Sequence, residues 1–276
     1  MRNLAIALAL ISICQIVSGQ GEIDTQEKLI FQNERSISLS LNTTGLAAGY
    51  RFGKRKTYLN KVLYDIELAY LKHPKEAKVS PNMVGYYTTS RRYVPGKLNL
   101  FVNLRPSIGF QHEMFSKEDR GSIAIKYYYS GGPSLGITKP IYYTYLIGDN
   151  RNGWYSIDAK YGYTQHPTLY GIAGRASFWK GFDELAIYPG LHATGGFSFE
   201  YSPQNRILNA IDVSATFDAF LKEIPIMLTE YNSRFFFTLS ISYRFGWVVE
   251  PKFKAPKITK EGGRSSREKG AKSKEN

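Results

Sequence analysis

A strict alternation of apolar and polar residues near the C-terminal end of the chain constrains the fold most. Every second residue from Phe235 to Trp247 is apolar, and the residues between them are mostly polar or small. This period of two is that of a β-strand with one apolar face. A strand that crosses an outer membrane needs about 9–11 residues and carries aromatic side chains at both interfaces. The run is long enough and is aromatic at both ends, so it predicts a membrane-crossing strand.

Nine further runs with the same alternation precede this one, each bounded by turn-forming residues. They lie at residues 36–41, 46–52, 62–70, 97–111, 123–129, 141–147, 155–163, 187–201 and 211–218. Together they predict an all-β fold, an antiparallel transmembrane β-barrel of about ten strands over residues 35–248. Eight or twelve strands are alternatives, because the run at 141–147 is weak. The mean hydropathy of −0.31 fits a barrel, in which only alternate residues face lipid.

The lengths of the connections favour this arrangement. If the amino terminus lies in the periplasm, one side of the membrane receives short links at 53–61, 114–120, 148–153 and 202–206. The other side receives links at 42–45, 74–96, 131–138, 165–186 and 221–233, of which three are long. Outer-membrane barrels have short periplasmic turns and longer outer loops. An even number of strands also places both chain ends in the periplasm.

Prolines and glycines mark irregular places in these runs. Pro106 lies inside a predicted strand, and a closed barrel has no free edge for a residue without an N–H group, so we expect a bulge there. The segment Ser130–Gly136 predicts an outer turn. Gly195 and Gly196 predict a bend in a strand, since glycine lets a barrel wall curve.

The first 19 residues predict a secretory signal peptide. A positive start, Met1–Asn3, precedes an apolar core, Leu4–Val17. Residues 20–34 then form an N-terminal periplasmic segment. The only cysteine, Cys14, lies within the signal, so the mature chain is expected to contain neither a disulfide nor a reactive thiolate. A lipoprotein would need a small residue before Cys14, where the chain has Ile13.

A basic tail is expected at residues 249–276. Between Pro251 and Asn276 the chain has nine bases and three acids, a net charge of +6 (nine minus three) out of +13. Its single aromatic residue, Phe253, cannot build a core, so the tail is expected to be disordered. A secreted chain argues against a nucleic-acid partner. Anionic cell wall, anionic lipid or an acidic protein fits such a tail, as does a solvated tail with no fixed partner.

The polar faces of the runs predict a filled interior. They carry six acids and six bases, and a selective pore usually has an excess of one sign at its constriction. A barrel of about eight strands is just wide enough to be filled by side chains, and ten leave little more. We therefore expect paired charges and a plugged lumen. The twelve residues are Asp65, Glu67, Asp158, Glu200, Asp212, Asp218, Arg51, Lys97, Arg105, Lys126, Lys160 and Arg244.

The histidines offer the only candidates for catalysis. His192 lies on a polar face near Thr194 and Glu200, a set that contains the residue types of a hydrolase triad. Outer-membrane barrels that remove acyl chains from lipid A have a serine–asparagine signature near their histidine, and Ala-Thr-Gly-Gly follows His192 instead. A packed interior histidine is therefore the preferred interpretation.

The remaining histidines, His73, His112 and His166, lie at strand ends or in loops. His73 and Glu76 share a loop, but two candidate ligands do not make a metal site. No catalytic, cofactor-binding or metal-binding residue is predicted.

The loop 165–186 has an unusual sequence. Its part Gly171–Leu185 combines small, charged and aromatic residues, including Phe178, Trp179 and Phe182. It could form a short helix, and it is expected to fold over the barrel mouth, lie at the lipid interface, contact a partner, or merely pack on the rim.

Two segments carry a resemblance to known proteins. Tyr128–Gly136 with Lys139-Pro140, and Phe178–Phe182 with Tyr188–Leu191, resemble uncharacterised outer-membrane barrels of the Bacteroidetes type. The resemblance spans most of the mature chain and brings no catalytic residue with it. A looser similarity, in architecture only, is to PorT-like barrels, which would imply a link to secretion and gliding.

These observations predict a barrel in the outer membrane of a Gram-negative cell. We expect a non-enzymatic structural, assembly or secretion-associated component without cofactors, in contact with outer-membrane lipid. A partner protein would dock on Gly171–Leu185 or on the basic tail. The alternatives are a lipid-modifying enzyme and a small-solute channel.

Overall fold

The computed structural model describes residues 33–80, 92–117, 122–149, 153–163, 169–202, 207–229 and 232–249. The strands in these residues are β1 (Asn33–Asn42), β2 (Gly45–Arg55), β3 (Asn60–Leu71), β4 (Asn99–Phe115), β5 (Ala124–Pro140), β6 (Tyr142–Asp149), β7 (Gly153–Lys160), β8 (Leu169–Arg175), β9 (Ala186–Glu200), β10 (Ile207–Phe220) and β11 (Phe235–Val249). The predicted signal peptide and nearly all of the predicted basic tail lie outside the described residues. No helix in the described part of the chain is long and apolar enough to cross a bilayer.

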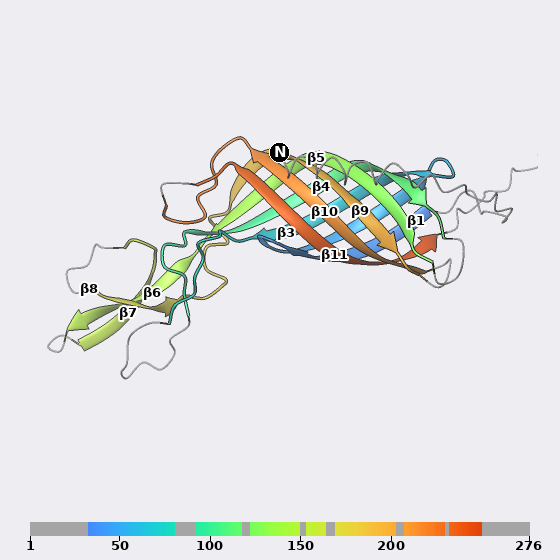
Figure 1. Ribbon diagram of the computed structural model, residues 1–276. Coiled ribbons are helices and arrows are strands. Elements are labelled where there is room, and N and C mark those ends of the chain that lie inside the picture. The colour runs from blue at the N-terminus through green and yellow to red at the C-terminus, as the bar shows by residue number, and fades with distance from the viewer. Residues whose placement is uncertain are drawn as a thin grey trace, which may run out of the picture.

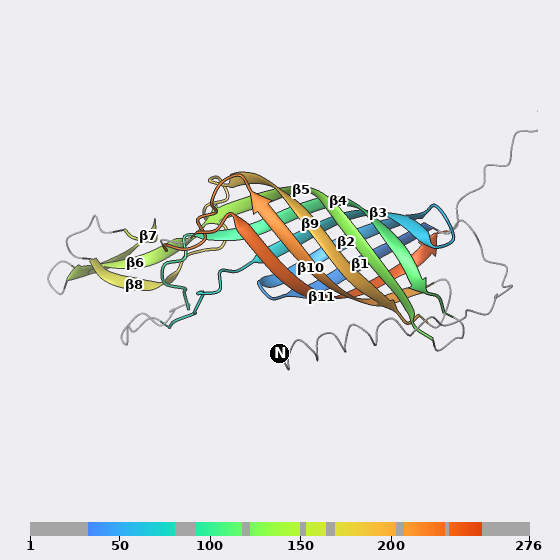
Figure 2. The same ribbon diagram turned by 45° about the horizontal axis from the view of Figure 1, so that its top comes forward.

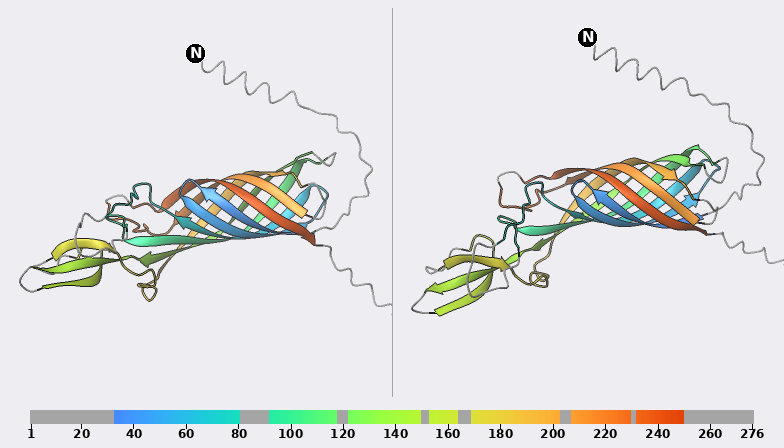
Figure 3. Two further views of the ribbon diagram at one scale, coloured as in Figure 1. Left: turned by 90° about the horizontal axis from the view of Figure 1, so that it is seen from below. Right: turned by 60° about the horizontal axis from the view of Figure 1, so that its bottom comes forward.

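Eight of these strands close an antiparallel barrel, in the order β1-β11-β10-β9-β5-β4-β3-β2 (Figures 1 and 2). The closing pair is β1 with β11, which runs in register from Asn33 opposite Val249 to Asn42 opposite Ser240. Strands β6, β7 and β8 form a separate sheet, which projects from one end of the barrel as an arm (Figure 3). The prediction of an all-β antiparallel barrel is confirmed, with eight strands rather than ten.

The two surplus strands are the alternating runs at 141–147 and 155–163. They form β6 and β7 of the arm, and a third arm strand, β8, lies at 169–175, where the sequence predicts a loop. In the arm, the apolar residues of the alternating pattern pack against one another. Tyr143 and Tyr145 are buried with Ile141 in a cluster. A period of two is common to every half-buried strand, so it could not separate the two cases.

With eight strands, most connections still lie at the end of the barrel to which the sequence assigns them. Removing two strands, an even number, leaves the alternation of ends unchanged. The start of β1, the end of β11 and the strand ends joined by the links at 56–59, 116–123 and 201–206 lie at one end of the barrel, called the chain-end side below. The longer links lie at the arm end. The link at 148–153 joins β6 to β7 within the arm and is not a periplasmic turn.

The glycine-rich segment Ser130–Gly136 lies inside β5 and does not form an outer turn. Its glycines permit close approach of the wall. A Cβ on Gly132 would lie 2.2 Å from the carbonyl oxygen of Pro106 on β4. Pro106 causes no bulge either: the register is the same at Leu104–Leu135 and Ile108–Gly131, and the three rungs between them are open. The wall therefore accommodates the missing N–H group of Pro106 by leaving three residue pairs between β4 and β5 without ladder hydrogen bonds.

The outer surface of the barrel is apolar and its inner surface is polar. On β11, Phe235, Leu239 and Trp247 are exposed, as are the other odd-numbered residues, whereas Thr238 and Arg244 turn inward and are buried. This is the reverse of a soluble protein, and it repeats on the other barrel strands.

An apolar lid closes the mouth at the arm end. Ile224 and Ile226, from the loop between β10 and β11, are fully buried against Phe101 and Phe220. The loop is held across the opening by Leu98, whose backbone N–H donates to the carbonyl oxygen of Ile226 at 3.0 Å. The lid therefore comes from residues 221–229. Of the positions expected for loop 165–186, its described part has a place in the arm and beside the outer wall.

The open ladder beside Gly132 yields a prediction with a matched control. Replacing Gly132 by Ala forces the new Cβ against the Pro106 carbonyl, so Gly132→Ala should lower the free energy of unfolding by about 1–3 kcal/mol. A Cβ on Gly195, also in the barrel wall, would have no neighbour within 4 Å, so Gly195→Ala should be neutral or slightly stabilising. Urea titration of the refolded variants measures both, and equal losses would contradict the close approach.

Candidate functional site: the ion-paired interior of the barrel

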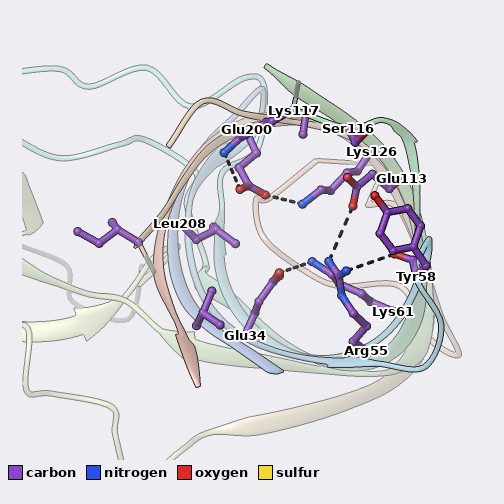
Figure 4. A pocket seen from close by; sticks show the side chains of 13 residues that line it. Glu34, Arg55, Tyr58, Lys61, Glu113, Ser116, Lys117, Lys126, Glu200 and Leu208 are labelled. Atoms are coloured by element: carbon purple, nitrogen blue, oxygen red, sulfur yellow. Dashed lines mark hydrogen bonds and ion pairs between the residues drawn. The ribbon is translucent and has the colours of Figure 1, made fainter. Parts of the chain in front are cut away.

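Charged side chains fill the interior in levels along the barrel axis. The level nearest the chain ends surrounds a cavity of about 170 Å³ (Figure 4). There Lys61 pairs with Glu34, and Glu200 pairs with both Lys126 and Lys117. In Figure 4 these side chains point toward one another across the opening. The pairs join β1 to β3 and β5 to β9 on two sides of the opening.

Asp212 organises the middle level. Its two carboxylate oxygens accept from different arginines, Arg244 at 3.1 Å and Arg51 at 3.5 Å. Arg51 also donates to Asp65 at 2.8 Å and lies over the ring of Tyr128, with its Cζ 4.5 Å from the ring centre. Three strands, β2, β10 and β11, thus meet at one carboxylate that is almost inaccessible to solvent.

Asp218 organises the level below the lid. Arg105 binds its carboxylate through two parallel hydrogen bonds, from Nε to Oδ1 at 2.9 Å and from Nη2 to Oδ2 at 2.6 Å. Asn103 donates to the same Oδ1 at 2.9 Å, and the remaining amino group of Arg105 donates to Glu67. A fork-to-fork pair of this kind is a strong, directional contact. Asp218 itself is fully buried, so its charge depends on these partners.

The predicted balance of charges holds, although three of its members change. Asp158 and Lys160 lie on β7 in the arm and not inside the barrel. Lys97 pairs with Glu76 at the root of the arm. Residues Glu34, Arg55, Lys61 and Glu113 were missed, and each extends the polar phase of its strand to the end, a signal that counting could have used. Seven acids and seven bases of the described residues are paired along the interior: Glu34, Asp65, Glu67, Glu113, Glu200, Asp212, Asp218, Arg51, Arg55, Lys61, Arg105, Lys117, Lys126 and Arg244.

His192 lies in the interior with partners other than those expected. Thr194 bonds to Thr216, and Glu200 belongs to the level near the chain ends, so neither contacts the imidazole. Instead, His192 Nδ1 lies 3.1 Å from the hydroxyl of Ser134, which donates to Asp218 at 3.3 Å.

This serine–histidine–aspartate set does not have the order of a hydrolase triad. In a triad the carboxylate holds the imidazole, and the other ring nitrogen receives the serine proton. Here the carboxylate binds Ser134, and Arg105 already occupies it. Ser134 and Asp218 are fully buried. The set is therefore a packed hydrogen-bond network, in line with the interpretation of His192 as an interior histidine.

The other histidines have local partners. His112 Nδ1 lies 2.7 Å from the Asn60 side-chain oxygen. The backbone N–H of His73 donates to Glu76, whose second oxygen pairs with Lys97. His166 lies outside the described residues. Within the part of the chain that the structure describes, no group of three or more histidine, cysteine, aspartate or glutamate residues could hold a metal ion.

The segment Gly171–Leu185 combines strand β8 with an aromatic turn. Phe178 and Phe182 lie over Lys139 on the outer wall, with the Lys139 Nζ 4.8 and 4.9 Å from the two ring centres. Trp179 points away and is 77% exposed. The turn therefore covers a cation on the barrel wall and presents an aromatic surface beside it.

Ion pairs fix this turn to the arm. Lys180 donates to Asp158 at 2.8 Å, and Lys160 pairs with Glu184. Burial alone would raise the pKa of Asp158, but hydrogen bonds from Lys180 and Thr144 outweigh it and lower the pKa. The bond from Lys160 likewise lowers the pKa of Glu184. Both carboxylates therefore remain ionised and paired at neutral pH.

No family model and no curated protein matches the chain. Its fold is similar to solved outer-membrane barrels. One is Ail, the attachment invasion locus protein of Yersinia pestis, in complex with the heparin analogue sucrose octasulfate, with 9% identity, coverage of 80% of this chain and 100% of that chain, and a TM-score of 0.37. Neisserial surface protein A shares 9% identity over 79% and 96% of the two chains at a TM-score of 0.34. The N-terminal barrel domain of Pseudomonas aeruginosa OprF shares 9% over 79% and 99% at 0.32. Scores this low transfer no function, so the architecture rests on the strand pairing itself.

The dependence of the interior on Asp218 can be measured. Asp218→Ala removes the shared acceptor of Arg105, Asn103 and Ser134 and leaves a buried guanidinium with only a half-exposed partner, Glu67. Breaking a buried pair in this way costs about 3–5 kcal/mol of folding free energy. Replacing both members by apolar residues of similar volume, Arg105→Met with Asp218→Leu, should recover most of the loss.

Urea unfolding of the refolded barrels tests this prediction. A single variant that is as stable as the parent protein would show that the interior pairs do not hold the wall together. If the double variant is no more stable than Asp218→Ala, the lost packing, and not the unpaired charge, determines the loss of folding free energy.

Proposed function

We propose that this chain is an integral barrel of the Gram-negative outer membrane that acts as a non-enzymatic structural, assembly or secretion-associated component. The observation that carries the proposal is the reversed amphipathicity of a closed, ion-filled barrel. Large apolar side chains form its outside, and its polar residues are turned inward and paired. An apolar outer surface of this kind suits a lipid surrounding. A closed barrel also satisfies its backbone hydrogen bonds internally, as a structure that spans a membrane must.

The chain-end side would face the periplasm and the arm the outside. The links at the chain ends are short, and the arm side has the long links, which is the asymmetry of outer-membrane barrels. A signal peptide at residues 1–19 would deliver the chain, and the basic residues from 249 onward would then meet the cell wall or a periplasmic partner. Both belong to the proposal.

The interior favours a plugged scaffold over a solute channel. Paired charges occupy successive levels. The cavity between the level of Asp212 and the level of Asp218 is only about 40 Å³, and the apolar lid closes the arm end. Planar-bilayer recordings distinguish the two roles: a steady, large conductance would favour the channel.

A lipid-modifying enzyme is the second candidate, and Ser134, His192 and Asp218 are the only observation in its favour. Their order is wrong for acyl transfer, and the hydroxyl is buried among interior charges, away from the lipid face. A changed lipid A acylation pattern in a deletion strain, restored by the parent chain but not by Ser134→Ala, would overturn the non-enzymatic role.

A partner would dock on the aromatic turn of Gly171–Leu185 at the root of the arm, away from the arm's tip. The arm extends beyond the barrel (Figure 1), and Trp179 is exposed beside it. This use of the barrel would accord with the resemblance to Bacteroidetes-type and PorT-like barrels and with a role in secretion. Loss of co-purified protein in Trp179→Ala, but not in Trp154→Ala at the tip of the arm, is the pattern this role requires.

The lipid-facing role of the wall gives the sharpest test of the proposal. Ile241 is exposed near the middle of β11, and Ile207 at the start of β10 near the end of the wall. Arginine at the bilayer midplane costs about 2–4 kcal/mol, and near the interface about 0–1 kcal/mol. In phospholipid bilayers, Ile241→Arg should therefore be much more destabilising than Ile207→Arg.

Cell fractionation provides the accompanying control. The parent protein should appear in the outer-membrane fraction and should migrate differently on gels before and after boiling. Equal effects of the two arginines, together with recovery from the soluble periplasm, would contradict the membrane location.

A further inference from the structure

A cavity of about 530 Å³ lies where the arm meets the barrel. It is separate from the ion-paired interior, because the wall end, the loop after β3 and the arm sheet all contribute to its lining. Arg175 and Tyr143 enter from the arm, Tyr70 from the end of β3, and Lys78 and Arg92 from the loop between β3 and β4. Its volume is within the range of small-molecule sites, about 300–1,000 Å³.

The lining has a strong excess of positive charge. Among the described residues, five bases line the cavity and one acid, Glu76. The acid is already engaged: one carboxylate oxygen accepts from the backbone N–H of His73 at 3.0 Å, and the other pairs with the buried Lys97. Lys72, Lys78, Arg92 and Arg175 form no ion pair with any described residue. In the barrel interior, by contrast, every base of the levels has a carboxylate partner.

The fold holds these cations in place. An antiparallel bridge between Val79 and Tyr93, with N–H···O distances of 2.8 and 3.1 Å, places Lys78 and Arg92 at diagonal positions on the same face of the bridged segments. The hydroxyl of Tyr143 lies 2.9 and 2.7 Å from the carbonyl oxygens of Val94 and Lys97, and its one proton is shared between these two acceptors, which fixes the loop to the arm. Tyr93 and Tyr143 also pack edge to face, with 5.9 Å between ring centres. The positive charges are therefore kept close together in spite of their mutual repulsion.

We propose that this cavity binds a saccharide that carries more than one phosphate group. Four cations without carboxylate partners favour a ligand with several negative charges, and one phosphate monoester supplies about two at neutral pH. Two arginines provide the planar forks that bind phosphate oxygens through paired hydrogen bonds. The tyrosine hydroxyls and ring faces suit the hydroxyls and the body of a sugar, and the volume admits a sugar unit with its phosphates.

Such a phosphosugar has two sources, the headgroup of an outer-leaflet lipid and a free sugar phosphate. The chemistry recognised is the same in both. The cavity lies above the barrel mouth at the root of the arm, and its binding can be measured in detergent without any assumption about where the protein resides in the cell.

The test is isothermal titration of the full-length protein in a detergent free of sugar and phosphate. The probes are glucose, glucose 6-phosphate and glucose 1,6-bisphosphate. We expect no binding of glucose and binding of the bisphosphate about tenfold tighter than that of the monophosphate. The affinity should fall as salt rises, because charges near the surface are screened. Absence of heat with the bisphosphate would overturn the proposal.

The chain offers a matched pair of lysines for the control. Lys78 lines the cavity, whereas Lys75, exposed in the same loop, does not. Lys78→Gln, Arg92→Gln and Arg175→Gln should each weaken binding of the bisphosphate about fivefold or more, and Lys75→Gln less than about twofold. All four substitutions are made at surface or half-buried positions, and the mobility shift on boiling confirms folding. If Lys75→Gln and Lys78→Gln weaken binding equally, net charge alone explains the effect, and the proposed site is overturned.

Titration with lipid A that carries two phosphates, or with its singly dephosphorylated form, identifies the source. Binding of lipid A at least about tenfold tighter than that of glucose 1,6-bisphosphate, and sensitive to Lys78→Gln, supports a lipid headgroup as the ligand. Equal affinities support a free sugar phosphate. If lipid A binds equally well to Lys78→Gln and to the parent protein, its contact is with the apolar wall, and the lipid source is excluded.

Discussion

The closure of the barrel is the constraint on which the rest of the structure depends. Once β1 pairs with β11, each barrel strand has a neighbour on both sides and no backbone edge remains open. Side chains must then face either outward or into a narrow lumen. The outward set is apolar, so the polar residues have only the lumen, and each charge placed there needs a partner in the same small space.

The interior satisfies this requirement by connecting distant strands. Asp218 on β10 accepts from Arg105 and Asn103 on β4 and from Ser134 on β5. Asp212 connects β2 with β11 through its two arginines. Buried ion pairs contribute less net stability than their geometry implies, because both charges were desolvated. Their greater effect here is on specificity, since a shift of one residue in any strand would turn these charges toward lipid.

The same comparison separates the interior from the cavity at the root of the arm. Inside the barrel, each carboxylate of the levels faces a base and the charges balance. At the arm, one carboxylate pairs with one lysine, and four other cations have no carboxylate partner in the part of the chain that the structure describes. An unbalanced cluster that the fold keeps together with a loop bridge and a tyrosine hydroxyl is suited to an anionic ligand, whereas a balanced one is suited to filling space.

The sequence alone determined the facing of most residues in the barrel strands, although not of Ser130–Gly136 in β5, which was predicted as a turn. Side chains of a strand alternate, so the positions of Phe235 to Trp247, Asp212 and Arg244 on their faces followed from residue order. The polar phase also contained Glu34 and Lys61, although the counted runs stopped short of them. Alternation could not decide which strands share a sheet, because Tyr143 and Tyr145 in the arm repeat every second residue just as the lipid-facing residues do.

Only the tertiary structure decided which charges meet. Arg105 and Asp218 are 113 positions apart, and Arg51 and Asp212 are 161 positions apart, so no local pattern could pair them. The lid is a similar case: Ile224 and Ile226 lie in a segment predicted only as an outer link, and they are buried because their loop is hydrogen-bonded across the mouth to Leu98. Residue order sets the direction of a side chain on its own strand, whereas its partner depends on the register and closure of all eight strands together.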